Sequence, residues 1–221
     1  MHGVFDIVGP IMIGPSSSHT AGAARLGKMA RTILGEEPVL ARIELHGSFA
    51  HTYKGHGTDK ALVAGLLGFS TDDERLRQAL DIADKRGLHV SFVAVDLGDV
   101  HPNTVAMNLM GQSGRSIRVV GSSVGGGNIR ITEIDGYAVE LTGEYPAMIV
   151  VHQDMPGIIS LVTHALAQKF VNIAYMRVSR QERGAMALMI IETDETIPPK
   201  ALQLVNGIDG IHVALLIPPI Q

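Results

Sequence analysis

The sequence predicts a protein of two α/β units: a mixed α/β unit over residues 1–146 and a βαββαβ unit of the ferredoxin-like type over residues 147–221. In the first part, helical patterns alternate with short apolar strands. Residues 143–146 have the composition of a linker, and after them strand, helix, two strands, helix and strand follow in that order. At 221 residues and 46% hydrophobic composition, the chain can bury a core without disulfides.

The composition excludes several classes of function. A net charge of −4 provides no basic surface for nucleic acid. No apolar run reaches the length of a membrane span, and the N-terminus lacks the features of a signal peptide, so we expect a cytoplasmic protein without membrane contact. Cysteine is absent, so thiolate ligands for zinc or an iron–sulfur cluster would have to come from another chain.

In the first unit, periodicity and turn residues predict the following elements in chain order. They are a lead-in over 4–10, a helix after a serine-rich turn that ends at Gly35, a strand over 39–45, a polar loop followed by a helix from about Thr58, a helix over 72–86, a strand over 89–95, a turn over 98–103, a hairpin of 104–110 with 116–120, a glycine-rich loop over 121–128, and a hairpin of 129–134 with 138–141.

In the second unit, the same signals predict a strand over 148–151, a turn over 154–157 that opens a helix, strands over 173–178 and 185–191, a short helix after 198–199 and a last strand over 211–217. A four-stranded sheet of this kind has an exposed edge, which favours pairing with a second copy. We therefore expect a homodimer formed through this unit.

The first candidate site lies in residues 14–20, where serines, a threonine and an imidazole directly precede a helical pattern. One serine is expected to cap the helix, and the free N–H groups and hydroxyls around the helix start favour a carboxylate or phosphate. His19 adds a group that can carry or donate a proton near neutral pH. The competing interpretation is a serine-rich cap and turn without a ligand.

The second candidate site lies in residues 45–60, which hold three histidines, two lysines and several glycines. The histidines are spaced by five, which suits neither one helical face nor one strand face, so a zinc site from these three is disfavoured. Lys54 and His56 instead indicate a glycine-hinged loop that presents a cation and an imidazole beside the next helix start. The alternative is a solvated polar turn.

The third candidate site is the glycine-rich stretch 121–128. Consecutive glycines allow a backbone to approach a ligand with its N–H groups forward, although the same stretch can be a flexible loop.

These three motifs, in this order and followed by a βαββαβ unit, resemble the beta chain of the two-chain, iron–sulfur-dependent L-serine dehydratases, and the resemblance covers the whole chain. The first part is also similar to the anion-binding, allosteric-substrate-binding-like module of some phosphoglycerate dehydrogenases. The terminal unit resembles an ACT domain, the amino-acid-sensing module of metabolic enzymes.

The resemblance implies conversion of L-serine to pyruvate and ammonia without pyridoxal phosphate, with a 4Fe–4S cluster that is held by the cysteines of an alpha chain and acts as Lewis acid on the serine hydroxyl. This chain would then recognise the substrate carboxylate. The implied catalytic residues are His19, His56 and Lys54. The implied substrate-binding residues are Ser16, Ser17, Ser18, Thr20, Asp59, Gly125 and Gly126. The implied effector-binding residues are Asp154, Pro156, Gly157, Asn172 and Ile173; no metal ligand is assigned to this chain.

Three interpretations stay open at this point. In the first, the chain contributes active-site residues to a heteromeric lyase together with the alpha chain. In the second, it is a purely regulatory subunit that binds an anion and an amino acid and has no catalytic group. A stand-alone zinc hydrolase is disfavoured by the histidine spacing. For the ACT unit, dimerisation without a bound effector is the alternative to sensing.

Overall fold

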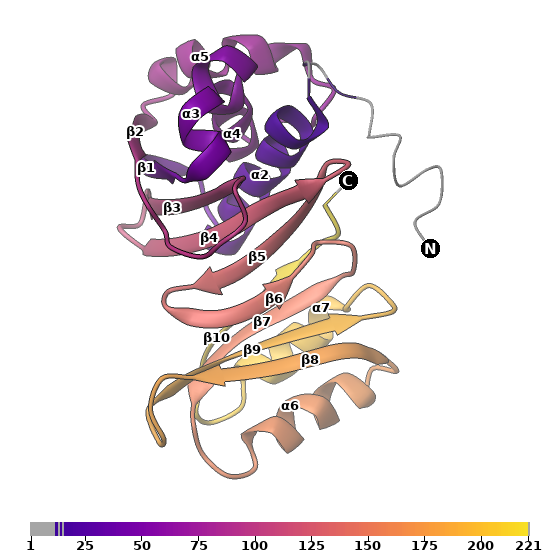
Figure 1. Cartoon of the computed structure of the whole chain (residues 1–221). Helices are drawn as coiled ribbons and strands as arrows, with labels where there is room; N and C mark the ends of the chain where they lie inside the picture. The colour runs from indigo at the N-terminus through magenta and orange to yellow at the C-terminus, as the bar shows by residue number, and fades with distance from the viewer. Residues whose placement is uncertain (1–11, 13, 15, 221) are drawn as a thin grey trace. The chain divides into compact units, whose positions relative to one another are not determined.

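The computed structural model describes Met12, Gly14 and residues 16–220, and the predicted lead-in over 4–10 lies outside these residues (Figure 1). The chain divides into two compact units after Asp135. This division comes earlier than the boundary predicted after residue 146, and the strand over 137–141, which follows it, contacts the later strands over 173–180 and 186–193.

The first unit consists of a mixed sheet and a set of helices. Its elements are η1 (Ser17–Gly22), α2 (Ala23–Leu34), β1 (Pro38–Leu45), α3 (Gly47–His56), α4 (Thr58–Leu66), η2 (Glu74–Gln78), α5 (Ala79–Lys85), β2 (His89–Ala94), β3 (Thr104–Gly111), β4 (Ser116–Gly125) and β5 (Asn128–Ile134). The strand order within this unit, up to residue 135, is β2-β1-β3-β4-β5; β1 and β2 run parallel and the other neighbours antiparallel. The helices gather on one face of this sheet (Figure 1).

Two of these helices, α2 and α4, cross at unusually short range because each places a glycine at the contact. A Cβ on Gly27 would overlap the carbonyl oxygen of Leu62, and a Cβ on Gly65 would lie 2.9 Å from the Cα of Gly27. The predicted end of α2 is confirmed: Gly35 adopts φ 81° and donates its N–H to the Arg31 carbonyl. This crossing fixes the segments that precede α2 and α4.

The prediction of a polar loop over residues 46–57 is wrong, because this stretch forms helix α3. Its hydrophobic periodicity is weak, and the helix is set by tertiary contacts instead. Phe49 is fully buried, and the N–H of Ser48 donates to the Pro102 carbonyl at 2.8 Å. Gly57, with φ 72°, ends α3 and starts α4, so the predicted helix from Thr58 is confirmed.

Two further predictions in this unit need correction. The helix predicted over 72–86 is a 3₁₀ segment followed by the short helix α5, because the carboxylate of Asp73 caps a tight first turn by accepting the Arg75 N–H at 2.9 Å. The glycine-rich loop predicted over 121–128 is strand up to Gly125, since Ser122 is buried and its hydroxyl bonds that of Thr104 at 2.7 Å.

The second unit contains β6 (Tyr137–Leu141), β7 (Ala147–Gln153), α6 (Ile158–Ala167), β8 (Ile173–Arg180), β9 (Met186–Thr193), α7 (Pro199–Asn206) and β10 (Ile211–Ile217). After β6, the order βαββαβ and the antiparallel sheet β10-β7-β9-β8 confirm the predicted ferredoxin-like fold.

The sheet of the second unit is covered differently on its two faces. Helices α6 and α7 pack on one face, over a core that includes Met148, Val162 and Ile191. β6 lies on the other face, where the hydroxyl of Ser179 in β8 donates a hydrogen bond to the carbonyl of Ala138 in β6. The sheet therefore has an open part beside β6, and this part carries the cavity described further below.

Candidate functional site around His19

The serine-rich segment of the first unit folds as one turn of π-helix, η1, that continues into α2. Ser16 is the N-cap, as predicted for one of the serines: its hydroxyl accepts the His19 N–H at 3.3 Å, and its carbonyl accepts the Thr20 N–H at 2.9 Å. η1 lies directly against β4, because a Cβ on Gly22 would overlap the hydroxyl of Ser123. π-Helical turns of this kind occur frequently at functional sites.

The imidazole of His19 is held between two hydroxyls that come from different parts of the chain. Its Nε2 lies 3.2 Å from the hydroxyl oxygen of Ser48, and its Nδ1 lies 3.4 Å from that of Ser16. The rings of Phe49 and His56 stand edge-on to it, with centroids at 5.3 and 4.8 Å. Since a hydroxyl can donate or accept, this arrangement supports either neutral tautomer of the imidazole.

The surroundings of His19 also favour its neutral form. Burial lowers the pKa of His19, and the nearby His56 lowers this pKa further. At neutral pH the ring therefore has one nitrogen lone pair that can take a proton from, or accept a hydrogen bond from, a ligand. Of the three predicted catalytic residues, the structure brings His19 and His56 together.

Sequence reasoning did not single out Ser48, which is a direct partner of His19. The available signal was its place two residues after His46, at the start of a stretch already noted for its histidines. In a loop, which the sequence predicts for this stretch, the direction of a serine hydroxyl cannot be inferred. Only the α3 helix shows that Ser48 and His56 both reach His19.

Around η1, three hydroxyls are fully or almost fully buried without a hydrogen-bond partner among the described residues. They belong to Thr20 in η1, Thr58 at the start of α4 and Ser123 in β4. A buried hydroxyl without a partner costs about 1–3 kcal/mol, so such groups commonly mark the place of a ligand or a bound water. Both α4 and β4 pack on η1.

The remaining predicted residues of the first unit lie at varying distances from this centre. Ser17 and Ser18 are half-buried in η1, and Asp59 is buried in the first turn of α4, where its carboxylate accepts the Lys60 N–H at 2.8 Å. Lys54 is exposed in the last turn of α3, with its Nζ 5.8 Å from the centroid of the Tyr53 ring. It therefore lies at a helix end and not, as predicted, in a hinged loop.

Of the predicted glycines, Gly125 is the last residue of β4 and Gly126 begins the turn to β5, with φ of 105° and 61°. The same turn is joined to α2 by Arg25, whose Nη1 donates to the Gly127 carbonyl at 3.0 Å. Burial lowers the pKa of Arg25, and its Nε has no hydrogen-bond partner among the described residues. Besides Lys54, Arg25 is therefore a cation of the first unit near the predicted site, and sequence reasoning missed it.

The three histidines of the second motif separate in space. His46 accepts the Leu97 N–H at its Nδ1 at 3.1 Å, His51 is exposed on α3, and His56 faces His19. No group of three or more His, Asp or Glu side chains able to hold a metal ion occurs within residues 16–220, Met12 and Gly14.

In the second unit, the structure does not bring the predicted effector residues together. Asp154 accepts hydrogen bonds from Arg180 at 2.7 Å and from the Gly184 N–H at 3.0 Å, which hold the pKa of its carboxyl below the usual range. Asn172 lies at the other end of β8, where its amide donates to Asp194 at 2.6 Å. The eight residues of β8 separate the two by about 23 Å.

The other predicted effector residues also lie at these two opposite ends of β8. Pro156 and Gly157 are exposed beside Asp154, in the turn before α6, and Ile173 follows Asn172 at the start of β8.

Comparison with known proteins identifies the family of this chain. Residues 3–133 match the family model described as the serine dehydratase beta chain. The chain is 46% identical over 208 residues to the probable L-serine dehydratase beta chain of Bacillus subtilis, covering 94% of each chain. It is 37% identical over 214 residues to the L-serine dehydratase beta chain of Peptoniphilus asaccharolyticus, covering 96% of each. The chain therefore belongs to the serine dehydratase beta-chain family.

Two more distant likenesses complete the comparison. The D-3-phosphoglycerate dehydrogenase of Archaeoglobus fulgidus is 27% identical over 192 residues, which cover 86% of this chain and 36% of that protein. The ACT domain from the GTP pyrophosphokinase of Chlorobium tepidum aligns with 32% of this chain and 94% of its own at 14% identity, with a TM-score of 0.26. In the described part of the chain, none of the helices is long and apolar enough to cross a membrane.

Proposed function

We propose that this chain is the beta subunit of a heteromeric L-serine dehydratase and that it binds the substrate carboxylate at η1, beside a neutral His19. The observation that carries the proposal is the position of His19, held between the hydroxyls of Ser16 and Ser48 at the start of α2. The named beta chains of Bacillus subtilis and Peptoniphilus asaccharolyticus, similar over nearly the whole chain, support the substrate and the reaction.

The first step of the proposal is recognition of the carboxylate. The start of η1 and α2 directs backbone N–H groups toward an anion, and the helix dipole favours negative charge there. The buried hydroxyls of Thr20 and Thr58 are the next donors available to such a ligand. Binding would give these hydroxyls the hydrogen bonds that they lack in the free chain.

The second step is proton transfer. Dehydration of serine removes a proton from the carbon next to the carboxylate, and negative charge develops on the carboxylate in the transition state. A neutral imidazole beside the carboxylate site can accept a proton at Nε2 and share it with the Ser48 hydroxyl at 3.2 Å. His56, which faces His19, would make a lasting charge on His19 unfavourable, so the proton would be passed on.

The proposal assigns the 4Fe–4S cluster to the alpha chain. This chain has no cysteine, so it has no thiolate with which to hold such a cluster. When bound, the cluster supplies a Lewis acid for the serine hydroxyl, whereas this chain's residues bind and orient the carboxylate. The predicted cytoplasmic location fits this assignment and is part of the proposal.

The test uses the complex reconstituted with its alpha chain under anaerobic conditions and follows serine-dependent pyruvate formation. We expect His19→Gln to reduce saturated turnover by at least about 100-fold, the usual contribution of a positioned acid or base. His51→Gln is the matched control, because His51 is exposed on the same helix as Ser48 and should leave turnover unchanged.

The alternative is a purely regulatory subunit, in which η1 binds an effector anion. It is favoured by the likeness to D-3-phosphoglycerate dehydrogenase, since an enzyme of different name shares this region. If His19→Gln shifts the serine or effector concentration needed for half-maximal activity and leaves saturated turnover intact, the regulatory function replaces the catalytic one.

For the second unit, we propose an ACT-type effector site that forms only in a homodimer. Asp154 and Asn172 lie at opposite ends of β8, and β8 is the edge strand of its sheet. Antiparallel pairing of β8 with the same strand of a second copy would bring the Asn172 of one copy toward the Asp154 end of the other. An Asn172→Ala variant that remains dimeric in sedimentation but no longer responds to added amino acid would support this site; a monomeric wild-type chain would exclude it.

A further inference from the structure

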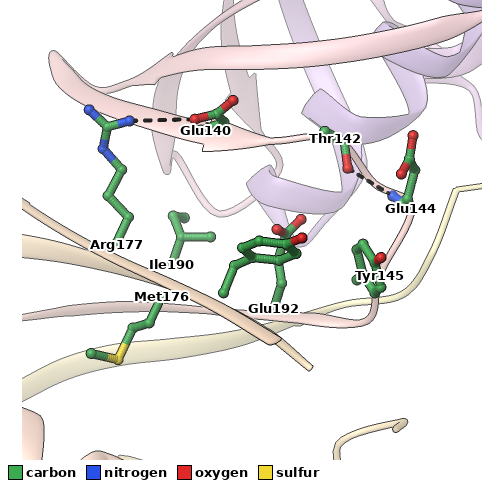
Figure 2. Close-up of a pocket in the computed structure, with 9 residues that line it drawn as sticks. Glu140, Thr142, Glu144, Tyr145, Met176, Arg177, Ile190 and Glu192 are labelled. Carbon is green, nitrogen blue, oxygen red and sulfur yellow. Dashed lines mark hydrogen bonds and ion pairs between the residues drawn. The ribbon is translucent and has the colours of Figure 1, made fainter. Parts of the chain in front are cut away.

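The second unit contains a cavity of about 590 Å³ on the face of its sheet opposite α6 and α7 (Figure 2). Ile190 and Glu192 of β9 form part of its floor, whereas their neighbours Met189 and Ile191 point into the core under the helices. Glu140, Thr142 and Glu144 border it from β6 and the segment that follows (Figure 2). The predicted effector residues are absent from its lining.

Glu192 is the buried acid of this cavity. The residue is only 7% exposed, and its Oε1 has no hydrogen-bond partner among the described residues. Burial raises the pKa of Glu192 and the like charges of Glu144 and Glu140 add to this, although a hydrogen bond from the Thr142 N–H acts in the opposite direction. Burying a carboxyl oxygen without a hydrogen-bond partner costs free energy, and a cationic ligand in the cavity would supply the missing hydrogen bond.

The other charges around the cavity leave it acidic. Arg177 is the positively charged residue of the lining, and its Nη1 lies 3.8 Å from the carboxylate of Glu140 (Figure 2). Both side chains are more than half exposed, at 52% and 58%. The charge of Arg177 is therefore directed to Glu140, and Glu144 and Glu192 are left without a matching cation in the lining.

Two tyrosines line the same cavity. The rings of Tyr145 and Tyr175 meet edge to face, with centroids 5.9 Å apart and an interplanar angle of 62°. Tyr175 is 62% exposed, so its ring is accessible to a ligand in the cavity. The face of an aromatic ring attracts an ammonium group, most strongly where water is partly excluded.

We propose that this cavity binds a small organic ammonium ion, with Glu192 as its counter-ion and the Tyr145 and Tyr175 rings against its carbon atoms. The apolar part of the lining, the two rings and Ile190, favours an organic cation over a bare metal ion, which requires several oxygen ligands at short range. The inference does not depend on the function proposed for the first unit, because all of its residues belong to the second.

The experiment titrates methylammonium chloride into the full-length chain and follows binding by calorimetry and by tyrosine fluorescence. The chain has four tyrosines and no tryptophan, so the two rings of the cavity contribute much of the signal. We expect saturable binding that Glu192→Gln weakens by at least about 10-fold, the effect of losing a charge-assisted hydrogen bond. Glu182→Gln makes the same charge change at an exposed position outside the lining and should not alter the affinity.

A second measurement detects the counter-ion itself. The bound ammonium ion should lower the raised pKa of Glu192, so that binding at a pH near this pKa releases protons and the observed heat depends on the ionisation enthalpy of the buffer. Glu192→Gln should abolish this dependence, and Tyr175→Leu should weaken binding while the proton release persists. Both variants are expected to keep a single cooperative unfolding transition, which excludes a trivial loss of structure.

Three outcomes would overturn the inference. The first is an absence of saturable methylammonium binding by the wild-type chain. The second is equal affinity in the wild-type chain and in Glu192→Gln. The third is full competition by potassium chloride at the same concentration, which would show a site for any monovalent cation without a contribution from the rings.

Discussion

Replacing Gly65 by alanine should destabilise the first unit, because Gly65 lies where α4 crosses α2. A Cβ at this position would overlap the carbonyl oxygen of Ala24 and lie 2.6 Å from the backbone nitrogen of Lys28. All of these obstacles are backbone atoms, so no side chain can rotate away. The two helices would have to separate, together with η1 at the start of α2.

The size of the effect follows from two opposing contributions. In an open helix, alanine is more stable than glycine by about 1 kcal/mol. Overpacking of a well-packed contact costs about 1–3 kcal/mol, and an overlap with backbone belongs at or above the upper end. We therefore expect a net loss of about 2 kcal/mol in the free energy of unfolding, which corresponds to a fall of roughly 4–8 °C in the thermal midpoint.

The assay is urea unfolding followed by circular dichroism, with Gly55→Ala as the matched control. Gly55 is also a helical glycine, in α3, but a Cβ there would meet nothing within 4 Å. The same substitution should therefore stabilise the chain at Gly55, by up to about 1 kcal/mol, and destabilise it at Gly65. Equal shifts of the unfolding midpoint in the two variants would refute the close crossing of α2 and α4.

Three further predictions concern Glu192 and the surroundings of His19. Because the pKa of Glu192 is raised, the folded chain binds more protons than the unfolded chain between pH 4.5 and the raised pKa of the folded state, and the wild type loses stability as the pH rises through this window. Glu192→Gln should flatten the pH dependence of the thermal midpoint there; parallel curves would contradict the assignment. His56→Gln should raise the pKa of His19, which an NMR titration of the imidazole protons measures, and an unchanged titration would show that the two rings do not interact. Ser48→Ala removes the 3.2 Å contact to His19 and should lower turnover of the reconstituted enzyme by about 2–10-fold; wild-type turnover would remove Ser48 from the site.

The sequence by itself determined the parts of this protein that depend on local chemistry. Hydrophobic periodicity placed most of the strands and the helices α2, α4 and α6, and the βαββαβ order of the second unit followed from them. A serine as the cap of the first helix, and Gly35 as the end of α2, were predictable because each acts within a few residues of itself. The same local reasoning predicted an anion site in residues 14–20, part of which forms η1.

The tertiary structure decided everything that depends on residues distant in sequence. Helix α3 forms because Phe49 is buried and Pro102 accepts its first N–H groups, and neither fact is visible in the periodicity of residues 46–57. Only that helix brings Ser48 and His56 to His19. Likewise, sheet register alone placed the two parts of the predicted effector site at opposite ends of β8. The register of β9 against β7 also decides that Glu192, near the end of an apolar strand, lines the same cavity as Thr142 and Glu144, which follow β6. The pairing of a strand with its neighbours fixes the face on which each side chain lies.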